Sequence, residues 1–226
     1  MTTNLDLSGR AIGLLAAQLL DVEKTRVAIN NRVQAAERDH SFTFEFNEFL
    51  KESYNSIIEQ EESLIKELER QVKQHPMGPW QKSFKGVGAK QFARLLGAIG
   101  DPYWHIAEDR PRSVAELWSY CGMAPGQIRR RGAKLNWSPE AKMRIHLIAK
   151  SIVKVGDRRA YDHRREVTAE RVHAAECVRC GPSGSPAQPG SPWNDGHKHA
   201  DALRYQGKMV LKEMWREARK LHGVTD

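Results

Sequence analysis

The chain has 226 residues and a formal net charge of +8 at pH 7, a length that allows one or two domains with a sizeable core. No apolar run is long enough to span a bilayer, which argues against an integral membrane protein. The N-terminal sequence lacks a charged segment followed by an apolar stretch, so we expect no secretory signal and a cytoplasmic location. Few segments alternate with the period of a strand, and the predicted fold is mainly α.

The charges are distributed unevenly along the chain. Residues 1–75 contain 9 Lys and Arg against 13 Asp and Glu, whereas residues 110–165 contain 14 against 4. A basic block of this density is typical of a surface that faces phosphate, so we expect a nucleic-acid partner. DNA is the first candidate and RNA the second. The alternative interpretation is a solubilising surface without a ligand.

Two long helices are expected at the N-terminus, over residues 9–38 and 47–74. Apolar residues recur in both at spacings of three and four, and the remaining positions are rich in charge. Two such helices joined by a short turn predict a helical hairpin or a coiled coil over residues 1–75. Its apolar stripe would serve as core or as the interface of a homo-oligomer.

A glycine turn opens the second predicted domain, residues 80–165. Gly86, Val87 and Gly88 stand between Phe84 and an apolar helical pattern. Glycine lets a backbone approach an anion closely, and the N–H groups at a helix start can bind phosphate. We therefore interpret the segment as a helix-hairpin-helix that contacts nucleic-acid backbone, with Lys85 and Lys90 beside the turn. A purely structural turn is the alternative.

The same region resembles the C-terminal domain of the RuvC-like (DEDD) insertion-sequence transposases, the bridge-RNA-guided recombinases. The likeness covers about residues 84–155, a third of the chain, and two motifs carry it. The matching residues are Gly86, Val87, Gly88, Gly100 and Asp101, followed by Tyr120, Gly122, Met123, Ala124 and Pro125. The resemblance implies a platform for DNA and RNA and an origin in a mobile element or phage.

Two departures from the family concern catalysis. Residues 1–75 do not match the acidic catalytic domain of these enzymes, and no serine stands between Pro125 and Asn136, where the family has its nucleophile. We therefore expect no catalytic residue and a protein that binds without reacting. An active transposase or recombinase is the alternative, with Ser138 as its nucleophile, and a protein-interaction adaptor that uses the coiled coil is a third.

The densest basic cluster precedes a helix predicted over residues 139–155. Ser138 and Pro139 are a helix-start signal, with Ser138 as the N-cap. Guanidinium groups suit phosphate because they donate two parallel hydrogen bonds. Trp137 could stack on an unpaired base, or it could simply be buried. The nucleic-acid-binding candidates here are Arg129, Arg130, Arg131, Lys134, Trp137, Lys142 and Arg144.

The C-terminal segment, residues 166–226, contains a candidate zinc-binding loop. Cys177 and Cys180 form a C-x-x-C step, which can present two thiolates to one tetrahedral zinc ion. His197 and His199 follow a loop rich in Pro and Gly that a metal would stabilise, and we expect them to complete a structural site. His173 is the substitute fourth ligand. A pair of thiols without metal is the alternative, and helices are expected over 157–176 and 199–221.

Overall fold

The computed structural model describes residues 7–39, 42–127, 132, 134–178, 180–182 and 185–224. This part of the chain is mainly helical, as predicted, with a single two-stranded sheet. None of its helices combines the length and the apolar character that crossing a bilayer requires. The elements, in chain order, are α1 Arg10–Arg38, α2 Phe44–Gln74, α3 Gly78–Ser83, α4 Ala89–Ile99, β1 Trp104–His105, β2 Arg110–Pro111, α5 Val114–Tyr120, α6 Pro139–Val155, α7 Arg159–Val167 and α8 Asp195–Leu221.

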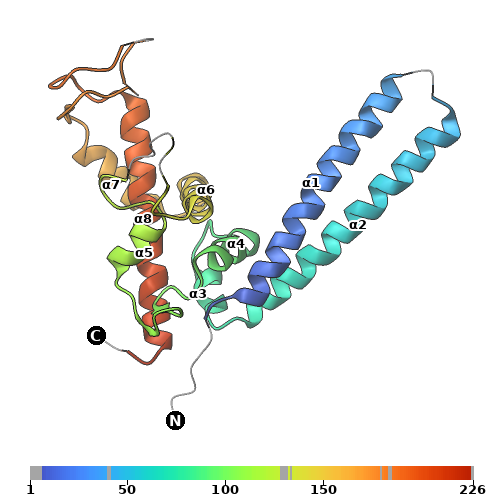
Figure 1. Cartoon of the computed structure of the whole chain (residues 1–226), viewed down its shortest axis with the longest axis horizontal. Helices are drawn as coiled ribbons and strands as arrows, with labels where there is room; N and C mark the ends of the chain where they lie inside the picture. Colours follow the sequence, from blue (N-terminus) through green and yellow to red (C-terminus); the bar gives the residue numbers. More distant parts are fainter. Residues whose placement is uncertain are drawn as a thin grey trace.

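Helices α1 and α2 lie antiparallel and form an arm that leaves the rest of the molecule at an angle (Figure 1). At 1.5 Å per residue each helix is roughly 45 Å long. Thr43 caps α2, because its hydroxyl accepts a hydrogen bond from the Phe46 N–H at 3.3 Å. Ion pairs join the two helices along the arm, with Arg26 Nε 2.5 Å from a carboxylate oxygen of Glu61.

The arm joins the body where α1 crosses α4. A Cβ atom on Gly97 would lie only 2.6 Å from the Cα of Gly13, so the two backbones touch at this crossing. Below the crossing, one cluster of buried apolar side chains runs from Leu7 at the start of the described chain to Ala218 in α8. Phe92, Ile145 and Met214 are fully buried in it and come from α4, α6 and α8. The arm therefore shares the core of the body.

The two motifs around Gly86–Asp101 and Tyr120–Pro125 contain residues with structural roles. Asp101 is buried, and its Oδ1 accepts hydrogen bonds from the backbone N–H groups of Tyr103 and Trp104 at 2.8 and 2.9 Å. Gly122, at φ 65°, ends α5 where a Cβ would lie 2.8 Å from the Trp137 ring. The Tyr120 hydroxyl donates to the carbonyl of Ala98 at 3.0 Å. These motifs hold the body together around α5.

Helix boundaries follow the sequence signals closely in one case and less closely in others. Helix α6 spans Pro139–Val155, as predicted, and the Ser138 hydroxyl caps it by accepting from the Ala141 N–H at 3.2 Å. The helix predicted over residues 157–176 is shorter than expected, because α7 ends at Val167. The chain then turns into a loop that carries the candidate metal ligands, and α8 begins at Asp195, four residues before the predicted start.

Candidate metal centre and the groove beside it

Four metal-ligating side chains come together at the N-terminal end of α8. His173, Cys177, Cys180 and His197 each offer one ligand atom, and these atoms all lie within 4.8 Å of one another. The Nδ1 of His197 is 3.1 Å from the sulfur of Cys180 and 3.7 Å from the sulfur of Cys177. The cluster is compatible with a metal site.

Local backbone structure positions each of these residues. Cys177 exchanges two backbone hydrogen bonds of 2.9 Å with Ala187, and the Cys180 N–H turns back to the Cys177 carbonyl at 3.3 Å. His173 is fixed by its N–H, which donates to the carbonyl of Ser191 at 2.9 Å. His197 lies in the first turn of α8, where its N–H donates to the Asn194 side chain at 2.8 Å. The loop thus folds back so that its two ends meet at the cluster.

The chemistry of these donors fits a metal ion. His173 is buried, and its Nε2 has no hydrogen-bond partner within the described chain. An unpaired buried ring nitrogen is costly unless a proton or a metal satisfies it. In a tetrahedral zinc site, bonds of about 2.0–2.3 Å place the ligand atoms roughly 3.3–3.8 Å apart. The separations from His197 to the two sulfurs are close to this range.

The cluster contains His173 in place of His199, which the sequence analysis predicted as a ligand. His199 lies outside the cluster, because its Nδ1 is hydrogen-bonded to the Tyr161 hydroxyl at 2.7 Å. Residues 197 and 199 are two positions apart on α8. At about 100° per residue they point to nearly opposite sides of the helix, so they cannot both face the same loop. His173, the substitute in the sequence analysis, takes the fourth position.

An aromatic contact joins the metal-ligating cluster to a neighbouring groove. The Trp193 ring stacks on His197, with centroids 4.0 Å apart and planes 10° from parallel. On the same tryptophan lies the guanidinium of Arg171, 4.9 Å from the ring centroid. Arg171 is exposed. The position of this arginine therefore depends on the loop that carries the cluster.

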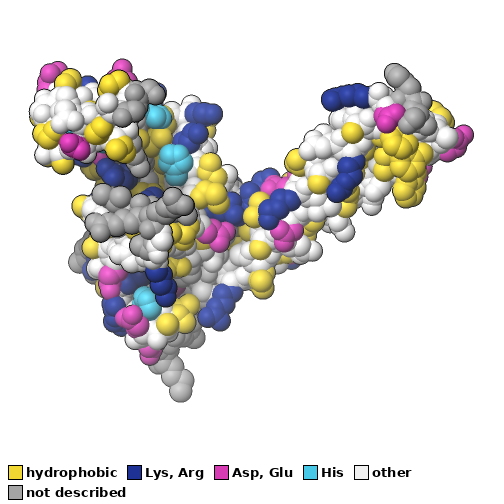
Figure 2. All heavy atoms as spheres, turned by 45° about the horizontal axis from the view of Figure 1, so that its top comes forward, with side chains coloured by type: hydrophobic (Ala, Val, Ile, Leu, Met, Phe, Trp, Pro, Cys, Tyr) yellow, Lys and Arg dark blue, Asp and Glu magenta, His cyan; other side chains and the backbone are white. Residues whose placement is uncertain are grey.

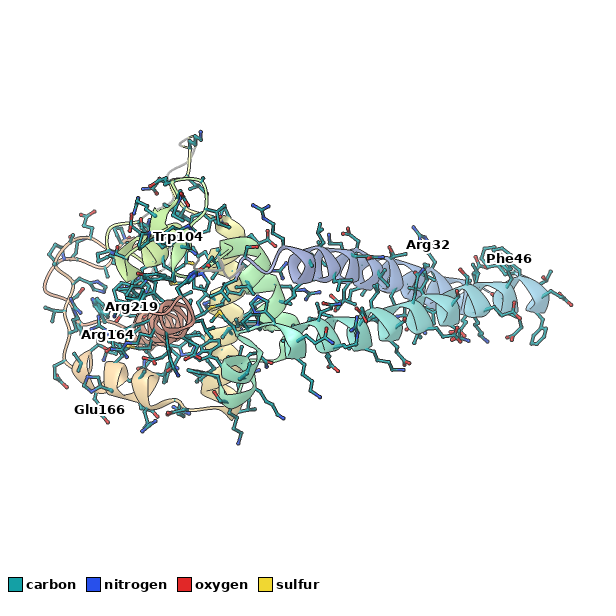
Figure 3. The ribbon with its side chains drawn as sticks, turned by 90° about the horizontal axis from the view of Figure 1, so that it is seen from below. Arg32, Phe46, Trp104, Arg164, Glu166 and Arg219 are labelled. Carbon is teal, nitrogen blue, oxygen red and sulfur yellow. The ribbon has the colours of Figure 1, made fainter. Side chains whose placement is uncertain are left out.

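The groove itself has a volume of about 500 Å³ and is rich in cations and aromatic rings. Among the described residues, the charged side chains of its lining are Arg164, Arg171, Arg204, Lys208 and one acid, Asp201. Arg164 lies over the ring of Tyr205, and Lys208 lies 4.2 Å from the centroid of the Trp118 ring. Figure 3 labels Arg164 beside α8.

The pKa values of two groups report the charge balance in the groove. Burial alone would raise the pKa of Asp201, but hydrogen bonds from Arg164 and Arg204 hold that pKa below its ordinary value. Burial, and then the positive charges of Arg204 and Arg164, lower the pKa of Lys208. Four cations thus face one carboxylate, which two arginines already share. The net field of the groove attracts anions.

The glycine turn, residues 86–88, lies outside the groove, and only part of it is exposed to solvent. Val87 is buried, as expected, and Gly88 is exposed at the start of α4 with no atom near the position of a Cβ. Gly86 has φ 94°, and a Cβ there would lie 2.9 Å from the Cα of Ile152. Gly86 therefore allows the turn to pack against α6 and does not face an anion. Lys85 is exposed beside it.

Two predicted phosphate contacts are engaged with carboxylates. The Lys90 ammonium lies 2.7 Å from Glu23 on the arm. Arg144 is buried and pairs with Glu140 at 3.2 Å, so neither residue adds to an open basic surface in the way the sequence analysis expected. The pairing of Lys90 could not be read from the sequence, because Glu23 is 67 residues away. The pairing of Arg144 could have been, because Glu140 stands one turn before it on the predicted helix.

The remaining candidates border a second cavity near the first. Trp137 and Lys142 line it together, with the Lys142 ammonium 4.8 Å from the Trp137 ring centroid. Lys134 is exposed. Arg204 and His197 line both cavities. Arg129, Arg130 and Arg131 lie outside the described residues.

Sequence reasoning missed most of the groove. Arg171 and Trp193 lie far in the chain from Arg204 and Lys208, which are one turn apart on α8, and only the folded loop brings the two pairs together. One available signal was the presence of Arg171 and Trp193 close in sequence to the candidate zinc ligands. Comparisons with protein-family models, with curated proteins and with solved structures found no match to this chain.

Proposed function

We propose that the cluster of His173, Cys177, Cys180 and His197 binds one structural zinc ion. Two thiolates and two imidazoles are a ligand set that zinc favours, and the closed four-ligand arrangement leaves no position for a substrate. Metal content of the purified chain, measured by mass spectrometry, tests the proposal. One zinc ion per chain supports it, and a metal-free protein that keeps its fold contradicts it.

We further propose that the chain binds nucleic acid through the groove, with DNA as the first candidate and RNA as the second. The observation that carries this proposal is a set of four cations around one buried carboxylate, three of which, Arg164, Arg171 and Lys208, lie over aromatic rings. Cations contact phosphates, and aromatic rings can stack on bases. The helix-hairpin-helix of α3 and α4, with Lys85 and the exposed Gly88, would add a second contact to the backbone.

The resemblance to the C-terminal domain of RuvC-like transposases supports the same class of partner. It suggests a protein that keeps the nucleic-acid-binding domain of these enzymes and lacks their catalytic activity. Ser138, the candidate nucleophile of the enzymatic alternative, accepts a hydrogen bond as the N-cap of α6. The proposed activity is therefore binding without catalysis.

A matched pair of arginines on α8 tests nucleic-acid binding. Arg204 and Arg216 are 52% and 54% exposed, and each pairs with a carboxylate three residues before it. Only Arg204 lines the groove. We expect Arg204→Glu to weaken binding of a labelled duplex by about tenfold or more and to reduce its salt dependence. Arg216→Glu serves as the control.

Parallel titrations with duplex DNA, single-stranded DNA and structured RNA identify the partner. The wild type should bind at least one of them with an affinity that decreases steeply with salt. Equal affinities for the Arg204→Glu and Arg216→Glu variants, or no binding of any of the three, would contradict the proposal.

The tip of the arm favours a second activity, association with another copy of the chain. Phe42, Phe44, Phe46 and Phe49 are all exposed there, and Figure 2 shows the apolar side chains gathered at the end of the arm. Exposed aromatic groups of this kind mark interaction surfaces. Light scattering tests the proposal: Phe44→Glu with Phe49→Glu should convert an oligomer to a monomer, and a wild-type monomer would refute it.

A further inference from the structure

A third cavity, of about 490 Å³, lies at the junction of the arm and the body, away from the groove. Its walls come from α1, α4 and α6, three helices that meet where the arm joins the body (Figure 1). Gly13 and Gly97 form the crossing of α1 and α4 at its wall, and Leu14 is 74% exposed beside it. Figure 2 shows basic and acidic side chains side by side where the arm leaves the body.

Two buried arginines line this cavity. The side chains of Arg94 and Arg144 are only 9% and 6% exposed. Each donates from Nη2 to a carboxylate, Arg94 to Glu23 at 2.6 Å and Arg144 to Glu140 at 3.2 Å. The Nε of each is buried and has no partner within the described chain. Because both Nε atoms are enclosed, a ligand in the cavity would meet the Nη groups of these two guanidinium groups.

The charges around the cavity favour an anion. Arg10, Arg94 and Arg144 lie with Asp21 and Glu140 in its lining. Beside the lining, the ammonium of Lys24 lies 3.0 Å from Asp21, and Glu23 pairs with both Arg94 and Lys90. The surplus is positive, and arginine donates several hydrogen bonds in a fixed plane. Phosphate has enough acceptor oxygens to meet donors from more than one guanidinium. The apolar wall of α1, including Leu14, can cover the rest of a phosphorylated ligand.

We propose that this cavity binds a phosphate group, with Arg144, Arg94 and Arg10 as its donors. This phosphate group belongs either to a free nucleotide or to a nucleic-acid backbone. The proposal is independent of the groove, because the two sites share no residue. Binding here would also fix the angle of the arm, since α1, α4 and α6 all contribute to the site.

Calorimetric titration of the full chain with inorganic phosphate and with AMP, and anisotropy with a labelled duplex, tests the proposal. Leu14→Glu puts a negative charge at the exposed edge of the cavity without altering the core, and we expect about tenfold weaker phosphate binding. Val27→Glu is the matched control, because Val27 is also exposed on α1 but lies about 20 Å further along the helix, beyond the reach of a screened charge. Arg144→Gln should abolish binding, with circular dichroism to show that it folds.

The three ligands separate the sources of the phosphate. Binding of AMP that weakens in Leu14→Glu assigns a free nucleotide, whereas an effect confined to the duplex assigns backbone phosphate. If Leu14→Glu and Val27→Glu bind all three ligands equally, the proposal is overturned. Arg204→Glu should leave binding of inorganic phosphate unchanged, so failure of the groove and failure of this cavity give different results.

Discussion

The two ends of α8 are built from similar residues and stabilised in different ways. At the C-terminal end, His222 lies 2.7 Å from the buried Asp101, and its ring lies against Tyr103 and Trp104. At the N-terminal end, His197 stacks on Trp193 and faces two sulfurs.

The difference lies in how the polar groups are satisfied. Both oxygens of Asp101 have donors from the chain itself, and Arg112 donates to the carbonyls of Ile99 and Pro102 in the same region. At the other end, the Nε2 of His173 is buried and has no hydrogen-bond partner among the residues that the structure describes. Where all buried polar groups are hydrogen-bonded within the chain, no ligand is needed. Where a buried polar group has no partner in the described chain, a ligand is expected to supply one. We therefore expect a ligand at the N-terminal end of α8 and not at its C-terminal end.

The largest expected effect is loss of the metal from the N-terminal end. Cys177→Ser removes a thiolate ligand and should lower zinc affinity by more than about 100-fold, since changes outside a ligand set already cost up to that amount. Mass spectrometry and competition with a chelator measure it. His199→Gln is the control, because His199 is bonded to Tyr161 and should leave the metal content unchanged. Retention of zinc in Cys177→Ser would contradict the assignment.

A smaller effect is expected at the C-terminal end. Asp101→Ala leaves the N–H groups of Tyr103 and Trp104 without an acceptor, and we expect a loss of about 2 kcal/mol in the free energy of unfolding. Urea denaturation measures it. Zinc content should remain that of the wild type, because the two ends of α8 are stabilised independently. A loss of zinc together with stability would show that they are coupled.

The smallest expected effect is a pH dependence at the groove. The pKa of Asp201 is lower in the folded chain than its ordinary value of 3.8, because hydrogen bonds from Arg164 and Arg204 outweigh the opposing effect of burial. The unfolded chain therefore takes up this proton at a higher pH, so the carboxylate stabilises the fold above about pH 4 and the contribution is lost as pH falls through the folded pKa.

Urea midpoints between pH 5 and pH 3 measure this contribution. The wild type should lose more stability over this range than Asp201→Asn, which cannot titrate. Metal release in acid affects both proteins, so the difference between them isolates Asp201. Parallel pH profiles would show that the pairing with Arg164 and Arg204 does not stabilise the fold.

The sequence predicted local features well. The Ser138 cap and Pro139 fixed the start of α6, and the C-x-x-C step identified the cysteines of the cluster. These signals are local, because a cap and a knuckle each involve residues within a few positions of one another. The mainly helical fold followed from the same kind of periodicity.

Contacts between distant residues could not be predicted. The choice of His173 over His199 depends on how the loop folds back, with the His173 N–H bonded to Ser191. The pairing of Lys90 with Glu23 depends on where the arm crosses α4. Gly86 was interpreted as a phosphate contact, but its packing against Ile152 is a property of the assembled body. The errors at Lys90 and Gly86 concern long-range contacts for which a single sequence contains no local signal, whereas the helical spacing of residues 197 and 199 was a local signal against using both as ligands.

The central claim is that the metal-supported loop at the N-terminal end of α8 presents cations to nucleic acid. Two arginines placed over tryptophans test it most directly: Arg171 over Trp193 in the groove, and Arg219 over Trp215 at the other end of α8 (Arg219 is labelled in Figure 3). The measurement is the affinity of the zinc-loaded chain for a labelled duplex. We predict that Arg171→Glu weakens binding by about tenfold or more and that Arg219→Glu changes it by less than about twofold. Equal effects of the two substitutions, or a larger effect of Arg219→Glu, would contradict the claim.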